Sequence, residues 1–171
     1  MKKLLFALIA GSAIAASAAP LDFTQKEYSA KIRQSGEIAS FENGVLRVFS
    51  KEPKQVGTVV ILNIADLFTR IGACGKTVEI TWESQWKEIT AINKPWAGIK
   101  FMLMYKKADG SMVYAGGFPN EKVQTEQDWQ LFRKTLKIPA EIKNPQLVLG
   151  LQGASGEVEF RNIQITVKEN R

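Results

Sequence analysis

The chain has 171 residues, with 23 Lys and Arg against 17 Asp and Glu, a formal net charge of +6 and no histidine. The lack of histidine excludes Ser-His-Asp and Cys-His catalysis and the common zinc sites, which depend on imidazole. The positive residues are scattered instead of clustered, so we expect no nucleic-acid partner, and the length suits one domain with its own core.

The first residues are typical of an export signal. Lys2 and Lys3 precede a short apolar run, and a small-x-small cleavage pattern ends at Ala18. We therefore predict a signal peptide at residues 1–18 and a single domain at residues 19–171. No later apolar run approaches the roughly 20 residues of a membrane helix, so we predict a secreted or periplasmic protein without membrane insertion.

Short strand-like runs separated by turn residues recur at intervals of about ten residues, which is typical of a β-sandwich. We predict an all-β fold, a two-sheet antiparallel β-sandwich (jelly roll) with one short helix. Asn-Gly after Glu42 and Asp-Gly after Ala108 predict hairpin turns, and Pro139 and Pro145 are expected to interrupt the strands. The predicted strands are, in chain order, 28–34, 37–41, 45–50, 57–62, 76–89, 98–107, 111–116, 129–138, 146–152 and 157–168.

One segment, residues 63–71, has its apolar residues at helical spacing. Asn63 is a residue that starts helices and Gly72 one that ends them, so we expect a short helix that closes one end of the sandwich. Cys74 is the single cysteine and has no partner for an intramolecular disulfide. We expect it to be a small apolar core residue.

The final stretch, residues 147–167, predicts two strands joined by a Gly-Ala-Ser-Gly turn at 153–156. Its apolar residues alternate, but the parity of the alternation changes after Phe160. A period-two pattern changes parity only where one residue is inserted, so we expect a β-bulge near Arg161-Asn162.

The leucine-rich strand, the Gly-flanked turn and the bulged last strand resemble the closing hairpin of carbohydrate-binding modules of the four/nine type. These are galactose-binding-like β-jelly rolls found attached to secreted glycoside hydrolases. The stretch VVILNIADLFTRIGACGKTVEITWESQW is similar to the family's passage from a strand through a helical turn into a long strand. WAGIKFMLMYKKADG and the later DWQLFRKTLKIPAEIKNPQLVLGLQGASGEVEF are similar to modules attached to family-five glycoside hydrolases. The resemblance implies non-catalytic binding of a polysaccharide or oligosaccharide, with a secreted glycoside hydrolase as a partner.

The chain departs from this family at one position. The family commonly has an aspartate after the aromatic residue of the last strand, where Phe160 is followed here by Arg161. Where that aspartate supports a structural calcium ion, arginine puts a positive charge at the site of a cation. We therefore expect no cofactor and no calcium, although Asn162 could supply one carbonyl oxygen and is the weak candidate for a metal ligand.

Sugars are bound by aromatic faces, which cover the C–H faces of the ring, and by planar polar side chains, which bond to the hydroxyls. Trp96 lies in a predicted loop and is the first candidate platform, because loops carry much binding function. Trp86, near the polar end of its strand, and Tyr114, beside two glycines, are the other candidate aromatics. Strand position adds three candidate hydrogen-bonding partners, Gln85, Lys100 and Gln152.

The other two tryptophans are expected in the core. Trp82 shares strand parity with the apolar residues before it, and the family's tryptophan at the place of Trp129 looks like a packing residue. Neither is a candidate for ligand binding.

Two alternative functions remain open. A small jelly-roll glycoside hydrolase needs only two carboxylates, about 5.5 Å apart in retaining and 6.5–9.5 Å apart in inverting enzymes. No strand shows a catalytic cluster of acidic residues, so we expect no enzyme and place Glu83 and Glu159 on a solvated outer face. An extracellular protein–protein interaction domain without sugar binding would expose a broad apolar patch in place of a groove lined by aromatic residues.

Overall fold

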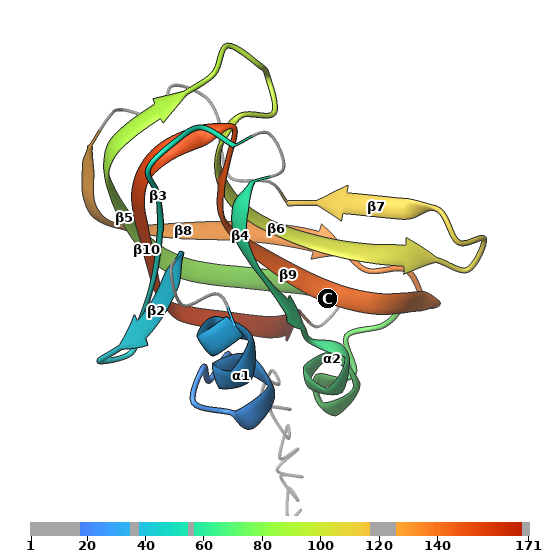
Figure 1. The fold of residues 1–171 in the computed structure, drawn as a ribbon. Helices are drawn as coiled ribbons and strands as arrows, with labels where there is room; N and C mark the ends of the chain where they lie inside the picture. The colour runs from blue at the N-terminus through green and yellow to red at the C-terminus, as the bar shows by residue number, and fades with distance from the viewer. Residues whose placement is uncertain (1–17, 35–37, 55–56, 117–125, 169–171) are drawn as a thin grey trace, which may run out of the picture.

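Two antiparallel sheets pack face to face in the computed structural model, which describes residues 18–34, 38–54, 57–116 and 126–168 (Figure 1). The six-stranded sheet has the order β2-β3-β10-β5-β8, with β1 paired to β10, and the four-stranded sheet has the order β4-β9-β6-β7. This architecture confirms the predicted all-β jelly-roll sandwich. The predicted signal peptide lies outside the described residues except for Ala18, where β1 begins.

The strands of the six-stranded sheet are β1 (Ala18–Pro20), β2 (Ala39–Glu42), β3 (Val45–Ser50), β5 (Thr77–Ala91), β8 (Gln127–Lys137) and β10 (Ala154–Lys168). Those of the four-stranded sheet are β4 (Thr58–Asn63), β6 (Gly98–Lys107), β7 (Met112–Ala115) and β9 (Ile142–Gln152).

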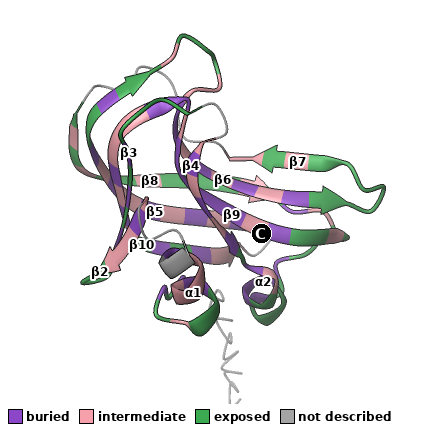
Figure 2. Cartoon of the chain, viewed as in Figure 1, coloured by how far each residue is buried: buried purple, intermediate pink, exposed green. Residues whose placement is uncertain are grey.

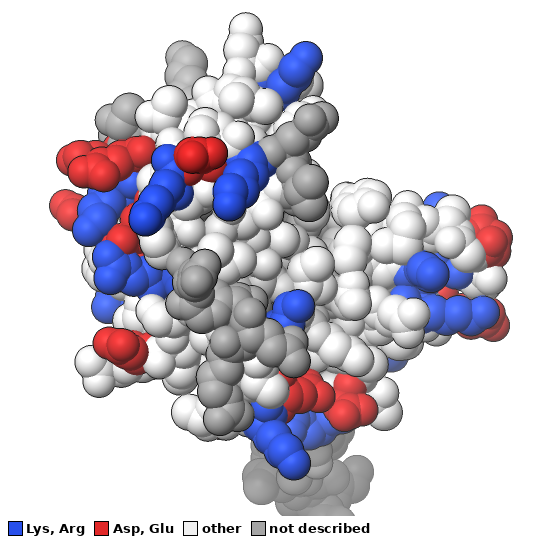
Figure 3. All heavy atoms as spheres, in the orientation of Figure 1, with Lys and Arg blue, Asp and Glu red and all other residues white. Residues whose placement is uncertain are grey.

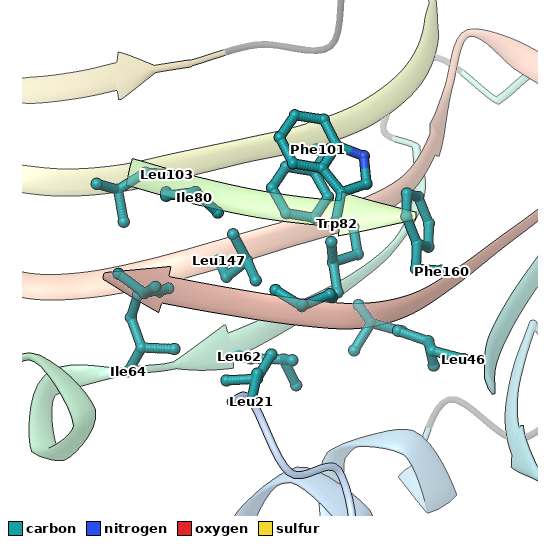
Figure 4. Close-up of a cluster of buried hydrophobic side chains, with 14 of the residues drawn as sticks. Leu21, Leu46, Leu62, Ile64, Ile80, Trp82, Phe101, Leu103, Leu147 and Phe160 are labelled. Carbon is teal, nitrogen blue, oxygen red and sulfur yellow. The ribbon is translucent and has the colours of Figure 1, made fainter. Parts of the chain in front are cut away.

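The core lies between the sheets, because each strand turns alternate side chains inward (Figure 2). Trp82 of β5 is buried as predicted and stacks on Phe101 of β6, with ring centroids 3.8 Å apart and an interplanar angle of 6°. Phe160 of β10 packs beside Phe101 at 5.9 Å (Figure 4). These three rings join the two sheets at the centre of the sandwich.

Both predicted hairpin turns are confirmed. Between β2 and β3, Asn43 has φ 50° and Gly44 has φ 79°, and positive φ at both central residues is what a type I′ turn requires. Between β6 and β7, the carboxylate of Asp109 accepts hydrogen bonds from the backbone N–H of Ser111 at 2.8 Å and from its hydroxyl at 2.6 Å. Local turn chemistry therefore fixes both connections.

The predicted bulge is also confirmed. Arg161 pairs with Glu83 and Gln164 pairs with Thr81, so two residues of β10 lie opposite one residue of β5. The first of the two, Asn162, has φ 52°. The inserted residue returns the apolar side chains of β10 to the core, as the change of parity requires.

The predicted closing hairpin is wrong. β9 belongs to the four-stranded sheet and β10 to the six-stranded sheet, and Gly153 alone separates them. With φ 57°, Gly153 turns the chain from one sheet across to the other. Alternation along each strand is the same in a hairpin and in such a crossing, so the sequence pattern did not distinguish them.

Two short helices cover one end of the sandwich, where one was predicted (Figure 1). The predicted helix is α2 (Ala65–Ile71), which Gly72 ends with φ 64°, as predicted. Its N-cap residue is Ile64 and not Asn63, although the Asn63 side chain accepts a hydrogen bond from the Ala65 N–H at 2.9 Å. The segment 28–34 was predicted as a strand but belongs to α1 (Lys26–Gln34). Neither helix is long enough to cross a bilayer.

The error over α1 has a simple cause. Tyr28 and Ile32 are both buried and lie four positions apart, a spacing that puts two residues on one face of a helix and equally on one face of a strand. Burial raises the pKa of the Tyr28 phenol to about 12.

Two smaller predictions are corrected. Cys74 is exposed, and its neighbour Ala73 fills the core instead. β9 starts at Ile142 and runs through Pro145, which was expected to interrupt it. Asn144, with φ 49°, lies where the pairing of β9 with β6 shifts register, and bulges are where strands accept proline.

Candidate functional site

The six predicted site residues separate onto two surfaces. Four of them come from the four-stranded sheet and the loop beside it: Trp96, Lys100, Tyr114 and Gln152. The other two, Gln85 and Trp86, belong to β5 of the six-stranded sheet. We call the solvent-facing side of the four-stranded sheet the four-strand face and that of the six-stranded sheet the six-strand face.

The four-strand face is mostly apolar in the middle. Tyr114 is 64% exposed and pairs with Met104, which is half-buried like its neighbour Met102. Val148 of β9 pairs with Met102 but is only 4% exposed, so the apolar surface consists mainly of the Tyr114 ring and the two methionines. Figure 3 shows this side of the molecule as largely uncharged at the centre, with charged side chains gathered around its margin. An exposed aromatic ring beside such a surface suits the C–H face of a sugar.

Lys100 and Trp96 are held together at one end of this face. The half-buried Lys100 ammonium donates a hydrogen bond to the Trp96 carbonyl oxygen, and burial lowers the pKa of Lys100. The ring of Trp96 lies over Gly153, where a Cβ would come within 2.8 Å of it. The Trp96 ring can therefore take this position only because Gly153, at the crossing between β9 and β10, has no side chain.

Gly150, in the second half of β9, is buried and has no room for a side chain. It pairs with Lys100 on one side and with Val59 on the other. A Cβ at Gly150 would lie 2.3 Å from the Thr58 carbonyl oxygen. The sequence reasoning missed this position, although glycine inside a leucine-rich strand is a known sign of close backbone approach. Gln152, two residues along β9, offers its amide beside this bare stretch.

The six-strand face carries a hollow of about 630 Å³ that is lined by residues of β3, β5, β8 and β10. We call it the polar hollow; it is lined by Arg47, Gln85, Trp86, Lys87, Glu126, Gln127, Asp128, Glu157 and Glu159. Trp86 is only 7% exposed, and its ring lies 6.1 Å from that of Phe132. This tryptophan therefore offers little surface for stacking, which argues against it as a candidate aromatic for ligand binding.

Trp129 is not a core residue, contrary to the prediction. It is half-buried, and the guanidinium carbon of Arg161 lies 3.9 Å from the centroid of its ring. Arg161 also pairs with Glu83 of β5 at 2.7 Å. The ring is thus covered by a cation–π contact on the six-strand face. The two residues belong to different strands, so no local sequence pattern could predict this contact.

The surroundings of Asn162 do not fit a calcium ion. Its amide nitrogen donates to one oxygen of Glu83 at 2.9 Å, while Arg161 donates to the other at 2.7 Å. These two hydrogen bonds hold the pKa of Glu83 below its ordinary value. A guanidinium already neutralises the carboxylate, whereas calcium needs several free oxygens. Within the described ranges, no three His, Cys, Asp or Glu side chains gather to hold a metal.

Two carboxyls of the six-strand face, Glu83 and Glu157, have a lowered pKa. Burial by itself raises the pKa of Glu157, but hydrogen bonds from Arg47 and Lys87 outweigh it and leave the pKa below its ordinary value. Glu159 faces outward, as predicted, and accepts a hydrogen bond from Gln85. A glycosidase acid needs a raised pKa, so the environments of Glu83 and Glu157 are the opposite of what that role requires.

No protein-family model and no curated protein matches the sequence. Solved structures that resemble the fold include carbohydrate-binding modules. A family 4 module (CBM4) is 12% identical, with a TM-score of 0.49 over 93% of this chain and 83% of that one. A family 16 module is 17% identical, with a TM-score of 0.46 over 75% and 80% of the two chains. The CBM22-1 xylan-binding domain from Paenibacillus barcinonensis is 14% identical, with a TM-score of 0.44 over 78% and 88%.

Proposed function

We propose that this domain binds a polysaccharide or oligosaccharide without acting on it chemically, and that the chain lies along the four-strand face. The observation that carries the proposal is that an exposed tyrosine, an ammonium group, an amide and an apolar surface all lie on one side of one sheet. Tyr114 supplies the ring, and Lys100 and Gln152 supply hydrogen bonds.

The ring and the polar groups bind different parts of a sugar. The hydroxyls of a sugar ring point outward around its edge, where fixed amide and ammonium groups can bond them, and its C–H faces are apolar. Lys100 is positioned by its bond to the Trp96 carbonyl, so its remaining N–H groups are oriented before a ligand arrives. Such preorganisation reduces the entropy lost on binding.

We further propose export through the signal at residues 1–18, and a secreted glycoside hydrolase as the protein that such a module serves. Whether the domain belongs to the four/nine type is part of the same proposal. Expression of the full chain with a C-terminal tag, fractionation of the cells and N-terminal sequencing of the product test export. A product that stays in the cytoplasm with residues 1–18 intact would refute it.

The test of binding is titration of residues 19–171 with cellulose, xylan, mannan, β-glucan and pectin. We expect at least one neutral glycan to bind, and Tyr114→Ala to weaken that binding at least about tenfold, since buried aromatic anchors dominate binding energy. Leu131→Ala is the matched control, because Leu131 is 60% exposed and lies on an edge strand of the other sheet.

Each outcome decides the proposal. Binding that persists in folded Tyr114→Ala and Gln152→Ala variants would move the site away from the four-strand face. Absence of binding to every glycan would refute carbohydrate binding there, and release of reducing sugar from the panel would show an enzyme. Circular dichroism of each variant establishes that it is folded.

A further inference from the structure

The polar hollow of the six-strand face is built differently from the proposed site on the four-strand face. Of its nine lining residues, eight have polar or charged side chains. Its volume of about 630 Å³ falls inside the roughly 300–1,000 Å³ of small-molecule sites. A ligand that fills it must form many hydrogen bonds and bury little apolar surface.

The floor of the hollow is rigid before any ligand arrives. Glu157 is bonded by Arg47 from β3 and by Lys87 from β5, and the Lys87 nitrogen lies 3.2 Å from it. Gln85 donates its amide to Glu159 two residues along β10. Three neighbouring strands therefore fix donors and acceptors in a single network, which is the arrangement that preorganises polar recognition.

Charge decides which polar ligands suit the hollow. Arg47 and Lys87 both form ion pairs with Glu157. The other carboxylates, Glu126, Asp128 and Glu159, make no ion pair with any residue that the structure describes. Phosphates, nucleotides and uronic acids would face this negative excess and are disfavoured.

A metal ion is disfavoured as well, since the described part of the chain shows no group of three possible ligands. Among uncharged ligands, one rich in hydroxyls suits the hollow best. Each hydroxyl can donate to a carboxylate and accept from an amide or a cation, and hydrogen bonds to ionised groups are about twice as strong as neutral ones.

We infer that the polar hollow is a second binding site, which takes a neutral sugar unit through Glu159, Gln85 and Asp128. The site is independent of the one on the four-strand face. With both, the domain holds two sugar chains on opposite sides of the sandwich and can cross-link them, with the gain in avidity that two linked contacts give.

Nuclear magnetic resonance on the isotope-labelled domain provides the test, because the side-chain amides of Gln85 and Gln127 line the hollow and give their own signals. The probes are glucose, galactose, mannose, xylose and cellobiose, with galacturonate as the anionic comparison. We expect at least one neutral sugar to shift the amide signals of both glutamines, and galacturonate to leave them in place.

Glu159→Gln keeps the shape of the side chain and removes its charge, and we expect it to weaken the effect about tenfold. Glu79→Gln is the matched control, since Glu79 is a carboxylate of the same sheet that pairs with Arg133 and Lys168 outside the hollow. Equal titration curves for Glu159→Gln and wild type would overturn the site.

The same spectra separate this inference from the proposed function. Shifts confined to the four-strand face, around Lys100 and Gln152, would refute the second site and leave the first. Shifts confined to the hollow would refute the proposed site on the four-strand face and leave the second site. No shift at Gln85 and Gln127 with any neutral sugar overturns the second site, whatever happens elsewhere.

Discussion

The two outer faces of the sandwich use their polar groups in opposite ways. On the six-strand face, most charged side chains are paired with each other, as in Glu157 between Arg47 and Lys87 or Glu83 beside Arg161. On the four-strand face, apolar side chains and bare backbone surround Lys100 and Gln152. Ion pairs between neighbouring strands thus neutralise these charges of the six-strand face, whereas the polar groups of the four-strand face lie among apolar side chains.

The largest expected effect concerns the bare backbone of the four-strand face. Gly150→Val would put a Cβ 2.3 Å from the Thr58 carbonyl oxygen, at a φ of 137°, so the strands must separate locally. We expect a loss of about 3 kcal/mol or more in the free energy of unfolding, measured by urea denaturation.

Gly110→Ala is the control for this prediction. Gly110 also has positive φ, at 85°, but a Cβ there would meet nothing within 4 Å. Strain without collision should cost about 1 kcal/mol. Equal losses in the two variants would contradict the close approach at Gly150.

The next prediction separates binding from stability on the same face. Lys100→Met removes the hydrogen bond to the Trp96 carbonyl, and glycan binding should weaken about tenfold. Stability near neutral pH should change by less than about 1 kcal/mol, because the lost bond is offset by relief from burying a charge. Calorimetric titration and thermal unfolding of the two proteins measure both quantities.

The pH dependence of Lys100 has a definite sign. Its pKa in the folded state is lowered from the ordinary 10.5, so the folded state disfavours the proton. Wild type should therefore gain stability relative to Lys100→Met as the pH rises through the folded pKa towards 10.5. A difference between the two proteins that stays constant from pH 8 to 11 would contradict the burial of this ammonium.

A smaller effect is expected for the cation–π contact of the six-strand face. Trp129→Leu keeps an apolar cover on the sheet but removes the ring beneath Arg161, and should cost about 1 kcal/mol. Leu131→Ala, at an exposed position on the same strand, should change stability by at most about 0.5 kcal/mol. Equal losses of stability in the two variants would show that the cation–π contact between Arg161 and Trp129 does not stabilise the fold.

The smallest expected effect is the response of the charged network to acid. Because the pKa of Glu157 lies below its ordinary value of 4.5 when folded, its contribution to stability is present above pH 4.5 and lost as the pH falls through the folded pKa. Glu157→Gln should make the acid loss shallower, by less than about 1.4 kcal/mol per pH unit, the limit for one proton. Unfolding free energies between pH 2.5 and 5 measure it; an unchanged slope would show that Arg47 and Lys87 do not act on this carboxyl.

Local chemistry made much of the fold predictable. The type I′ turn at Asn43-Gly44, the capped helix α2 and the parity change at Arg161-Asn162 each depend on a few adjacent residues. The candidate site was partly predictable as well, since Tyr114, Lys100 and Gln152 could be chosen by strand position and residue type.

What failed depended on partners far along the chain. Trp129 was expected in the core, but Arg161, 32 residues later, covers it on the outside. Cys74 and Ala73 are both small, and only the packing of α2 against the sandwich decided which of them is buried. α1 was missed because two buried residues, Tyr28 and Ile32, are too few to distinguish a helix from a strand.

The sequence by itself determined the sandwich class, most strand positions and the residue types available for sugar binding, because periodicity and turn chemistry act over a few residues. The tertiary structure alone decided that Gly153 crosses between the sheets, so that Trp96, Lys100 and Gln152 meet on one face while Gln85 lies on the other. Strand alternation specifies which side of a strand is buried, but not the sheet that the strand joins. That choice is made by the packing of the whole core.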